Sequence, residues 1–176
     1  MARSSAVRRG LSGNRASKIG ICLAWLAASP ALASDWKVDD TISALDGSRT
    51  YAATLPSSNT IRIAAGDDEH ATLVVRCAAT QLEAYIAWPQ LVGKDALDMR
   101  WRADSGTSVA EIWSVSRDGS ATFSENARAL LAGLKQAQHA TFQIVLANFE
   151  TLQATFNVAG TDAISSAALS ACPERR

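Results

Sequence analysis

The sequence predicts an α+β fold built on a mostly antiparallel sheet, arranged as a β-sandwich or an open barrel. One helix is expected to be inserted among the strands, and a C-terminal helix is expected to be tied to the sheet by a disulfide. Three observations predict this fold. Apolar residues alternate with period two in short stretches spread over residues 36–158, helical spacing occurs in two stretches, and two cysteines remain once an N-terminal leader is removed.

The alternating stretches give the expected strands. Leu73, Val75 and Cys77 lie two residues apart, as do the apolar residues of the next stretch, 82–88. Because alternate side chains of a strand point to the same side of a sheet, Cys77 is expected to face the core with Leu73 and Val75. The same alternation occurs at 36–38, 51–55, 61–63, 99–103, 142–146 and 152–158.

Two Asp-Gly pairs mark expected turns between strands. Asp46-Gly47 lies between the stretches at 36–38 and 51–55, and Asp118-Gly119 lies within "AEIWSVSRDGSATF". Asp-Gly is favoured in type I′ turns, because both central residues of such a turn have a positive φ. The second pair therefore predicts a hairpin with a type I′ turn.

Two stretches have the spacing of amphipathic helices. Between 124 and 138, buried positions are expected at Ala127, Leu130, Leu131 and Leu134, with Ser124 as the N-cap. Near the end of the chain, Thr161 is expected to cap a helix over 162–172. Its apolar stripe consists of Ile164, Ala168, Ala171 and Cys172.

The first 33 residues have the pattern of a secretory signal peptide. They contain five basic residues and no acidic residue, followed by an apolar run at 19–28 and the cleavage pattern Ala31-Leu32-Ala33. We therefore expect a cleaved leader at 1–33 and a single exported β-rich domain at 34–176, located in the periplasm. The export route stays open, because Arg8-Arg9 also resembles part of a twin-arginine signal.

Removal of the leader changes both the charge and the cysteine content. The chain has 17 basic and 17 acidic residues, and loss of five basic residues leaves a net charge of −5. This charge argues against binding to nucleic acid or to anionic membrane surfaces. Cleavage also removes Cys22, so Cys77 and Cys172 are expected to form a disulfide in an oxidising compartment. No later segment approaches the roughly 20 apolar residues of a membrane span, so no transmembrane segment is expected in the mature chain.

Side chains that could support catalysis are scattered along the sequence. His70 follows an acidic run at 67–69 in an expected turn, and His139 follows the inserted helix, where a cation suits the helix C-terminus. There is no nucleophile elbow, no phosphate-binding glycine loop and no metal-ligand spacing. We therefore expect no enzyme activity, no cofactor and no metal site. An enzyme would have to use the acids at 67–69 together with Asp104.

Arginines are the polar side chains most suited to binding a partner. Arg100 and Arg102 flank Trp101 in an expected strand, so they should project from one face of the sheet, with Arg76 in a position to lie near them. A guanidinium can bind a carboxylate or phosphate bidentately. Arg76, Arg100 and Arg102 are therefore candidate partner-binding residues, although ordinary exposed arginines would follow the same pattern.

The order of several motifs resembles a known family. "LVVRC" (73–77), "MRWRAD" (99–104), "WSVSRDGSATF" (113–123) and "TFNVAGTDAISSAALSAC" (155–172) occur in this order. They resemble the TagO/VasI family of periplasmic proteins associated with bacterial type VI secretion. The closing motif is also similar to exported proteins of the invasion-associated locus B type.

The resemblance implies a non-enzymatic accessory protein of the envelope, without a cofactor, that contacts other envelope or secretion-system proteins. It carries over no catalytic residue. What it carries over is the cysteine pair, Cys77 and Cys172, and the aromatic hairpin position Trp113. The function expected is therefore a binding or scaffolding module. The alternatives are an inhibitor of a cell-envelope enzyme, an enzyme acting in the envelope, and a carrier of a small ligand or lipid.

Overall fold

A computed structural model gives the fold of the chain after its first 34 residues. It describes residues 35–45, 47, 49–63, 66–78, 80–93 and 95–172. The expected leader at 1–33, Cys22 and Asp46 of the first expected turn lie outside the described residues. None of the helices among the described residues has the length and apolar content needed to cross a membrane.

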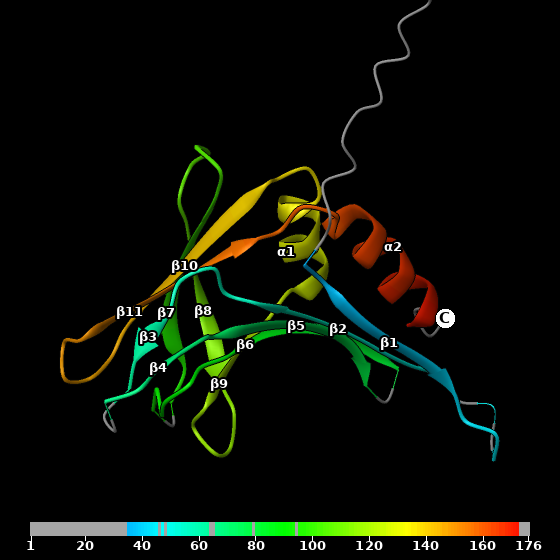
Figure 1. The fold of residues 1–176 in the computed structure, drawn as a ribbon, viewed down its shortest axis with the longest axis horizontal. Coiled ribbons are helices and arrows are strands. Elements are labelled where there is room, and N and C mark those ends of the chain that lie inside the picture. Colours follow the sequence, from blue (N-terminus) through cyan, green and yellow to red (C-terminus); the bar gives the residue numbers. More distant parts are fainter. Residues whose placement is uncertain are drawn as a thin grey trace, which may run out of the picture. The chain divides into compact units, whose positions relative to one another are not determined.

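Nine strands form one sheet in the order β1-β2-β5-β6-β9-β8-β7-β10-β11, and every pairing within it is antiparallel. The sheet is strongly curved, as Figure 1 shows, so that β11 at one edge contacts β2, the second strand from the other edge. Its strands are β1 (Lys37–Ile42), β2 (Arg49–Pro56), β5 (Thr72–Ala78), β6 (Gln81–Ala87), β7 (Leu97–Ala103), β8 (Val109–Val115), β9 (Ala121–Ser124), β10 (His139–Val145) and β11 (Thr151–Asn157). A short ribbon is formed by β3 (Ile61–Arg62) and β4 (Asp68–Glu69). The predicted α+β class with an open, mostly antiparallel sheet is confirmed.

The inward face of the sheet forms the core. Leu73, Val75 and Cys77 are buried on it, as the alternation predicts. At its centre, the Phe142 ring lies 6.0 Å from the Trp101 ring, 5.9 Å from the Trp113 ring and 5.8 Å from the Phe156 ring. Aromatic rings at these separations add attraction beyond the area that they bury.

Two helices cover this inward face and contact each other (Figure 1). α1 (Ala127–Leu134) buries the four predicted residues Ala127, Leu130, Leu131 and Leu134. α2 (Thr161–Ala171) packs against β2 and β5 and buries Ile164 and Ala168.

The helix caps differ from those predicted. The N-cap of α1 is Asn126, whose Oδ1 accepts a hydrogen bond from the Ala129 backbone N–H, whereas Ser124 Oγ accepts one from Asn126 N. Gly160, with a φ of 87°, precedes α2, and the Thr161 hydroxyl donates to the Val158 carbonyl instead of capping. Before α1, Ser124 and Asn126 are both suitable N-cap residues, and helical spacing does not choose between them; before α2, the N-cap is a glycine, which offers no side chain for capping.

The hairpin between β8 and β9 forms at Asp118-Gly119, but its turn is not type I′. Only Gly119 has a positive φ, of 81°, whereas type I′ requires two such residues. The Ser116 hydroxyl accepts hydrogen bonds from Ser120 N and Ala121 N, and the Ser116 carbonyl accepts one from Gly119 N. These bonds close a loop that is longer than two residues.

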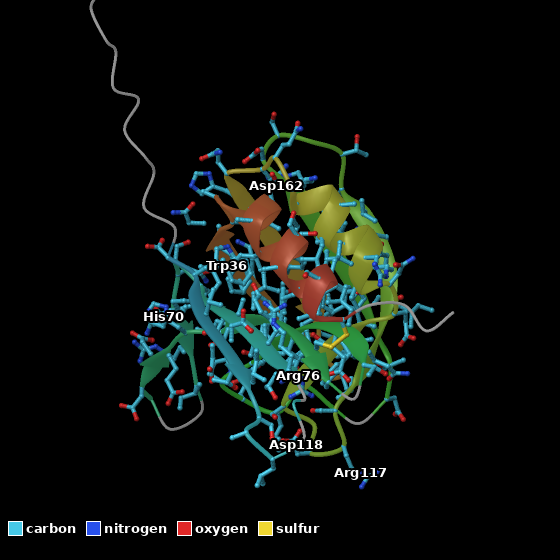
Figure 2. All side chains as sticks on the ribbon, turned by 90° about the vertical axis from the view of Figure 1, so that its right-hand side faces the viewer. Trp36, His70, Arg76, Arg117, Asp118 and Asp162 are labelled. Atoms are coloured by element: carbon cyan, nitrogen blue, oxygen red, sulfur yellow. A yellow bond between two sulfur atoms is a disulfide. The ribbon has the colours of Figure 1, made fainter. Side chains whose placement is uncertain are left out.

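The disulfide predicted from the sequence joins Cys77 on β5 to Cys172 at the end of α2. The two Cα atoms lie 5.5 Å apart, which is within the normal range for a disulfide. Figure 2 shows the sulfur–sulfur bond between the last turn of α2 and the sheet, at the opposite end of the helix from Asp162. The bond thus fixes the C-terminal helix over the core.

The two edges of the sheet differ. The outer edge of β11 is hydrogen-bonded by the segment that follows β2: Ser58 N donates to the Thr155 carbonyl at 2.7 Å. Asn59 Oδ1 accepts from Thr155 N at 2.7 Å, and Asn59 Nδ2 donates to the Gln153 carbonyl at 2.9 Å. Asn59 therefore acts as a short substitute for a neighbouring strand. β1 forms the other edge, and all six of its residues are exposed.

Loss of the disulfide should strongly destabilise the protein. Closure of a loop of 95 residues is worth about 4–5 kcal/mol in the chain-entropy account. Replacing Cys77 or Cys172 with serine should therefore lower the free energy of unfolding by about that amount, measured by urea denaturation. As a control, a Cys77→Ala, Cys172→Ala protein should not respond to a reductant. Two free thiols in the native protein, detected by alkylation and mass analysis, would contradict the disulfide.

Removal of the Asn59 side chain should open the β11 edge. Asn59→Ala leaves Thr155 N without its acceptor, at a cost of about 1–3 kcal/mol. We expect faster hydrogen exchange at the Thr155 amide and a lower melting temperature. The control is Asn148→Ala, which removes a side-chain hydrogen bond to Glu150 N in an exposed turn. An equal effect of the two substitutions would argue against the role assigned to Asn59.

Candidate functional site

Arg100 and Arg102 lie on the outward face of β7, opposite to the core-facing Trp101. Across the strand pairing with β10, Arg102 lies beside Thr141 and Arg100 lies beside Gln143. The next strand, β11, continues these rows with Thr155 and Gln153. Each guanidinium therefore stands next to hydroxyl or amide groups that can share a ligand with it.

Two hollows on this face share Arg100 and Gln143. The first, of about 220 Å³, is lined by Arg100, Trp101, Arg102, Ser108, Thr141, Gln143 and Gln153. The second, of about 340 Å³, reaches Asp98 and Val145. The two hollows therefore adjoin each other at Arg100 and Gln143, along the seam between β7 and β10. We call this surface the β7–β10 trough and define it by Asp98, Arg100, Arg102, Thr141 and Gln143.

Neither Arg100 nor Arg102 makes an ion pair or a hydrogen bond with its side chain within the part of the chain that the structure describes. Other arginines among the described residues do have acidic partners. They include Arg49 with Asp40 at 2.6 Å, Arg62 with Asp68 at 3.5 Å and Arg76 with Glu83 at 2.7 Å. Two neighbouring guanidinium groups without an acid partner repel each other and gain from an added anion.

The structure does not bring Arg76 to the other two arginines. Arg76 lies on β5, and β6, β9 and β8 separate it from β7. Its Nε donates to Glu83, and its guanidinium carbon lies 5.1 Å from the centre of the Tyr85 ring. The hydrogen bond to Glu83 raises the pKa of Arg76. Figure 2 places Arg76 on the side of the sheet away from α2. A contact of Arg76 with a partner stays a prediction, but it would be made at a separate place.

The acids considered for catalysis do not converge. Asp68 and Glu69 form β4, and Asp67 precedes it, whereas Asp104 lies at the turn that follows β7. Within the described ranges, no group of three or more His, Cys, Asp or Glu side chains could hold a metal ion. His70 Nδ1 lies 2.7 Å from the Ser57 carbonyl and so belongs to the packing of that segment.

Asp104 has a structural position that the sequence did not reveal. Its carboxylate accepts hydrogen bonds from His139 N at 2.8 Å and from Gln138 N at 3.2 Å. Both hydrogen bonds lower the pKa of Asp104, and the bond from His139 has the larger effect. The His139 ring nitrogen Nδ1 lies 4.0 Å from the same carboxylate. His139 begins β10, so its predicted role at the C-terminus of α1 is wrong.

Sequence reasoning found the arginines of the trough but missed its other residues. Thr141 and Gln143 occupy the polar positions of an alternating stretch whose apolar positions were assigned to the core. Their alternation placed them on the outward face. What the sequence did not give was the pairing of β10 with β7, which sets them beside the arginines.

Comparisons with known proteins support the fold and no more. No protein-family model matches the sequence, and no curated protein matches it significantly. Among solved structures, the chain is similar to invasion associated protein B from Bartonella henselae, with 12% sequence identity and a TM-score of 0.50. The match covers 78% of this chain and 92% of that one. It agrees with the similarity of the closing motif to proteins of that type. The resemblance to the TagO/VasI family receives no support from these comparisons.

The Asp104 carboxylate should stabilise the fold in a pH-dependent way. Because its pKa is lowered in the folded protein, its contribution is present above the unfolded value near 3.8 and is lost as the pH falls through the folded value. Wild type should therefore melt at a higher temperature than Asp104→Asn at pH 7, and the difference should shrink below pH 3.8. Asp67→Asn serves as the control, since its side chain has no hydrogen bond within the described residues. A constant difference between wild type and Asp104→Asn would refute this account.

Proposed function

We propose that this chain is an exported, non-enzymatic accessory protein of the bacterial envelope that binds another protein through the β7–β10 trough. The observation that carries the proposal is the pair Arg100 and Arg102. They stand on one exposed face, without an acid partner in the described part of the chain, beside the hydrogen-bonding side chains of β10. Arginine is enriched at protein interfaces, where it can bind carboxylates bidentately.

The leader pattern and the cysteines support export to the periplasm. A signal peptide at 1–33 and a single domain at 34–176 would place the disulfide in an oxidising compartment, where such bonds persist. The bond between Cys77 and Cys172 fits that location. We therefore propose a periplasmic protein, released from its leader by cleavage.

The separation of the acidic groups supports a non-enzymatic role. General acid–base chemistry needs groups that reach one reacting bond. Asp104 is engaged by two backbone N–H groups, and Asp68 lies 3.5 Å from Arg62 in the β3–β4 ribbon. We propose no cofactor and no metal.

A more specific version of the proposal is a role in type VI secretion. Its support is the order of the four motifs that resemble the TagO/VasI family. The similar solved structure is described as invasion associated; the likeness concerns the fold and does not point to type VI secretion. If the gene for this chain lies among type VI sheath and baseplate genes, the role in type VI secretion is supported. If the genome contains no such genes, that role is rejected.

Among the alternatives, a carrier of a small ligand or lipid would need an apolar interior space. The aromatic cluster of Trp101, Trp113, Phe142 and Phe156 fills the centre of the inward face. The trough, in contrast, is polar and lies outside. A binding module for a protein, which includes an inhibitor of an envelope enzyme, fits these features better.

A charge reversal at the trough should strongly weaken partner binding. A photo-reactive amino acid in place of Ser108, which lines the trough, would crosslink a bound protein in cells of the source organism. The Arg100→Glu, Arg102→Glu variant should reduce the crosslinked product at least about tenfold, because each substitution replaces attraction with repulsion.

The matched control is Lys37→Glu, Arg117→Glu, which makes the same change in net charge at two exposed residues away from the trough. Figure 2 shows Arg117 at the tip of the β8–β9 hairpin. This control should leave crosslinking unchanged. Equal recovery from all three proteins, with disulfide and melting temperature intact, would reject the trough as the binding surface.

A further inference from the structure

The outward side chains of β7 carry an ordered charge pattern. Arg102, Arg100 and Asp98 occupy alternate positions on one face and are all exposed. Alternate residues of a strand lie about 6.6–6.8 Å apart, so the pattern is positive, positive, negative over about 13–14 Å. Asp98, like the two arginines, has no side-chain partner among the described residues.

The neighbouring strand offers groups that suit a peptide backbone. The Thr141 hydroxyl lies 3.2 Å from the Thr155 hydroxyl. The side-chain amide of Gln143, in contrast, has no hydrogen bond within the described residues. Gln143 belongs to both hollows, midway along the trough. Its amide can both donate and accept, which are the two functions that a peptide group requires.

The end of the trough at Asp98 is flanked by apolar side chains. Ile112 on β8 pairs with Asp98, and Val145 lines the same hollow; both are exposed. A lysine or arginine could place its charge at Asp98 and lay its methylene stem on this apolar surface. A third acidic group would instead meet the Asp98 carboxylate.

Resting on the proposed function, we infer that the ligand of the trough is an extended segment of a partner protein with acidic residues at two alternate positions and a basic residue two positions further on. An extended chain repeats its side chains at the spacing of Arg102, Arg100 and Asp98, so all three charges are matched at once. The carboxylates bind the guanidinium groups, and the basic residue binds Asp98.

The geometry of the trough favours an extended chain over a helix. Its lining side chains stand on the adjacent strands β7 and β10, whose backbones are about 4.8 Å apart. A helix has a diameter of about 10–12 Å and would rest on the rim of such a seam. A polyanion such as nucleic acid would bring further negative charge to Asp98 and to a domain whose expected net charge is −5.

Short capped peptides test the charge pattern on the mature, disulfide-bonded protein. Gly-Glu-Ser-Glu-Ser-Lys-Gly and its reversal, Gly-Lys-Ser-Glu-Ser-Glu-Gly, cover the two directions in which a strand can lie. Gly-Glu-Ser-Lys-Ser-Glu-Gly has the same composition, but its lysine falls opposite Arg100. By NMR titration, one of the first two peptides should bind at least about fivefold more tightly than the third.

Charge reversal at Asp98 provides the matched variant. Asp98→Lys should reverse the preference, so that Gly-Glu-Ser-Glu-Ser-Glu-Gly binds more tightly than the patterned peptide, while Lys37→Glu, Arg117→Glu should keep the wild-type order. Equal affinities for patterned and permuted peptides, or no measurable binding of any of them, would overturn this inference. The proposed function would then still stand if crosslinking at Ser108 depends on Arg100 and Arg102, and would fail separately if it does not.

Discussion

The bond between Cys77 and Cys172 holds the element on which the burial of the core depends. A curved sheet of nine strands has one apolar face, and α1 and α2 cover it. α1 has only eight residues, which is too short to be stable without packing. The disulfide fixes α2 to β5, and α2 contacts α1 in turn. The disulfide therefore anchors the helical layer to the sheet, and it stabilises α2 directly and α1 through its contact with α2.

Packing on the inward face of the sheet also determines the position of the strand that carries the two outward-facing arginines. Trp101 stacks on Phe142 and lies so close to α1 that a Cβ on Gly133 would come within 2.7 Å of its ring. The glycine is thus required by the close approach of the helix to the indole. Because Arg100 and Arg102 adjoin Trp101 on the same strand, the packing of one indole fixes the backbone that carries both arginines. Side chains on a rigid strand can match the spacing of a ligand more accurately than those on a loop.

Local features of the sequence predicted much of the fold, whereas contacts between distant segments were beyond it. The leader pattern left two cysteines in an expected oxidising compartment, alternation placed Cys77 on the core side, and helical spacing identified the stripe that contains Cys172, so the disulfide could be predicted. Alternation does not give the order of strands, because that order depends on long-range pairing. Arg76 was therefore grouped with Arg100, although three strands lie between β5 and β7. Gln143 was missed, although it lies beside Arg100 on the neighbouring strand.

The edges of the sheet explain why a face is the better place for recognition. At β11, Asn59 and Ser58 already satisfy the backbone groups that an added strand would need. At β1, Asp39 and Asp40 occupy the middle of the exposed edge, so antiparallel pairing with a second copy would bring carboxylates together. Strand addition is opposed at both edges by different means. Binding through side chains avoids both obstacles, and its specificity then depends on the charges of the β7–β10 trough instead of on backbone hydrogen bonds.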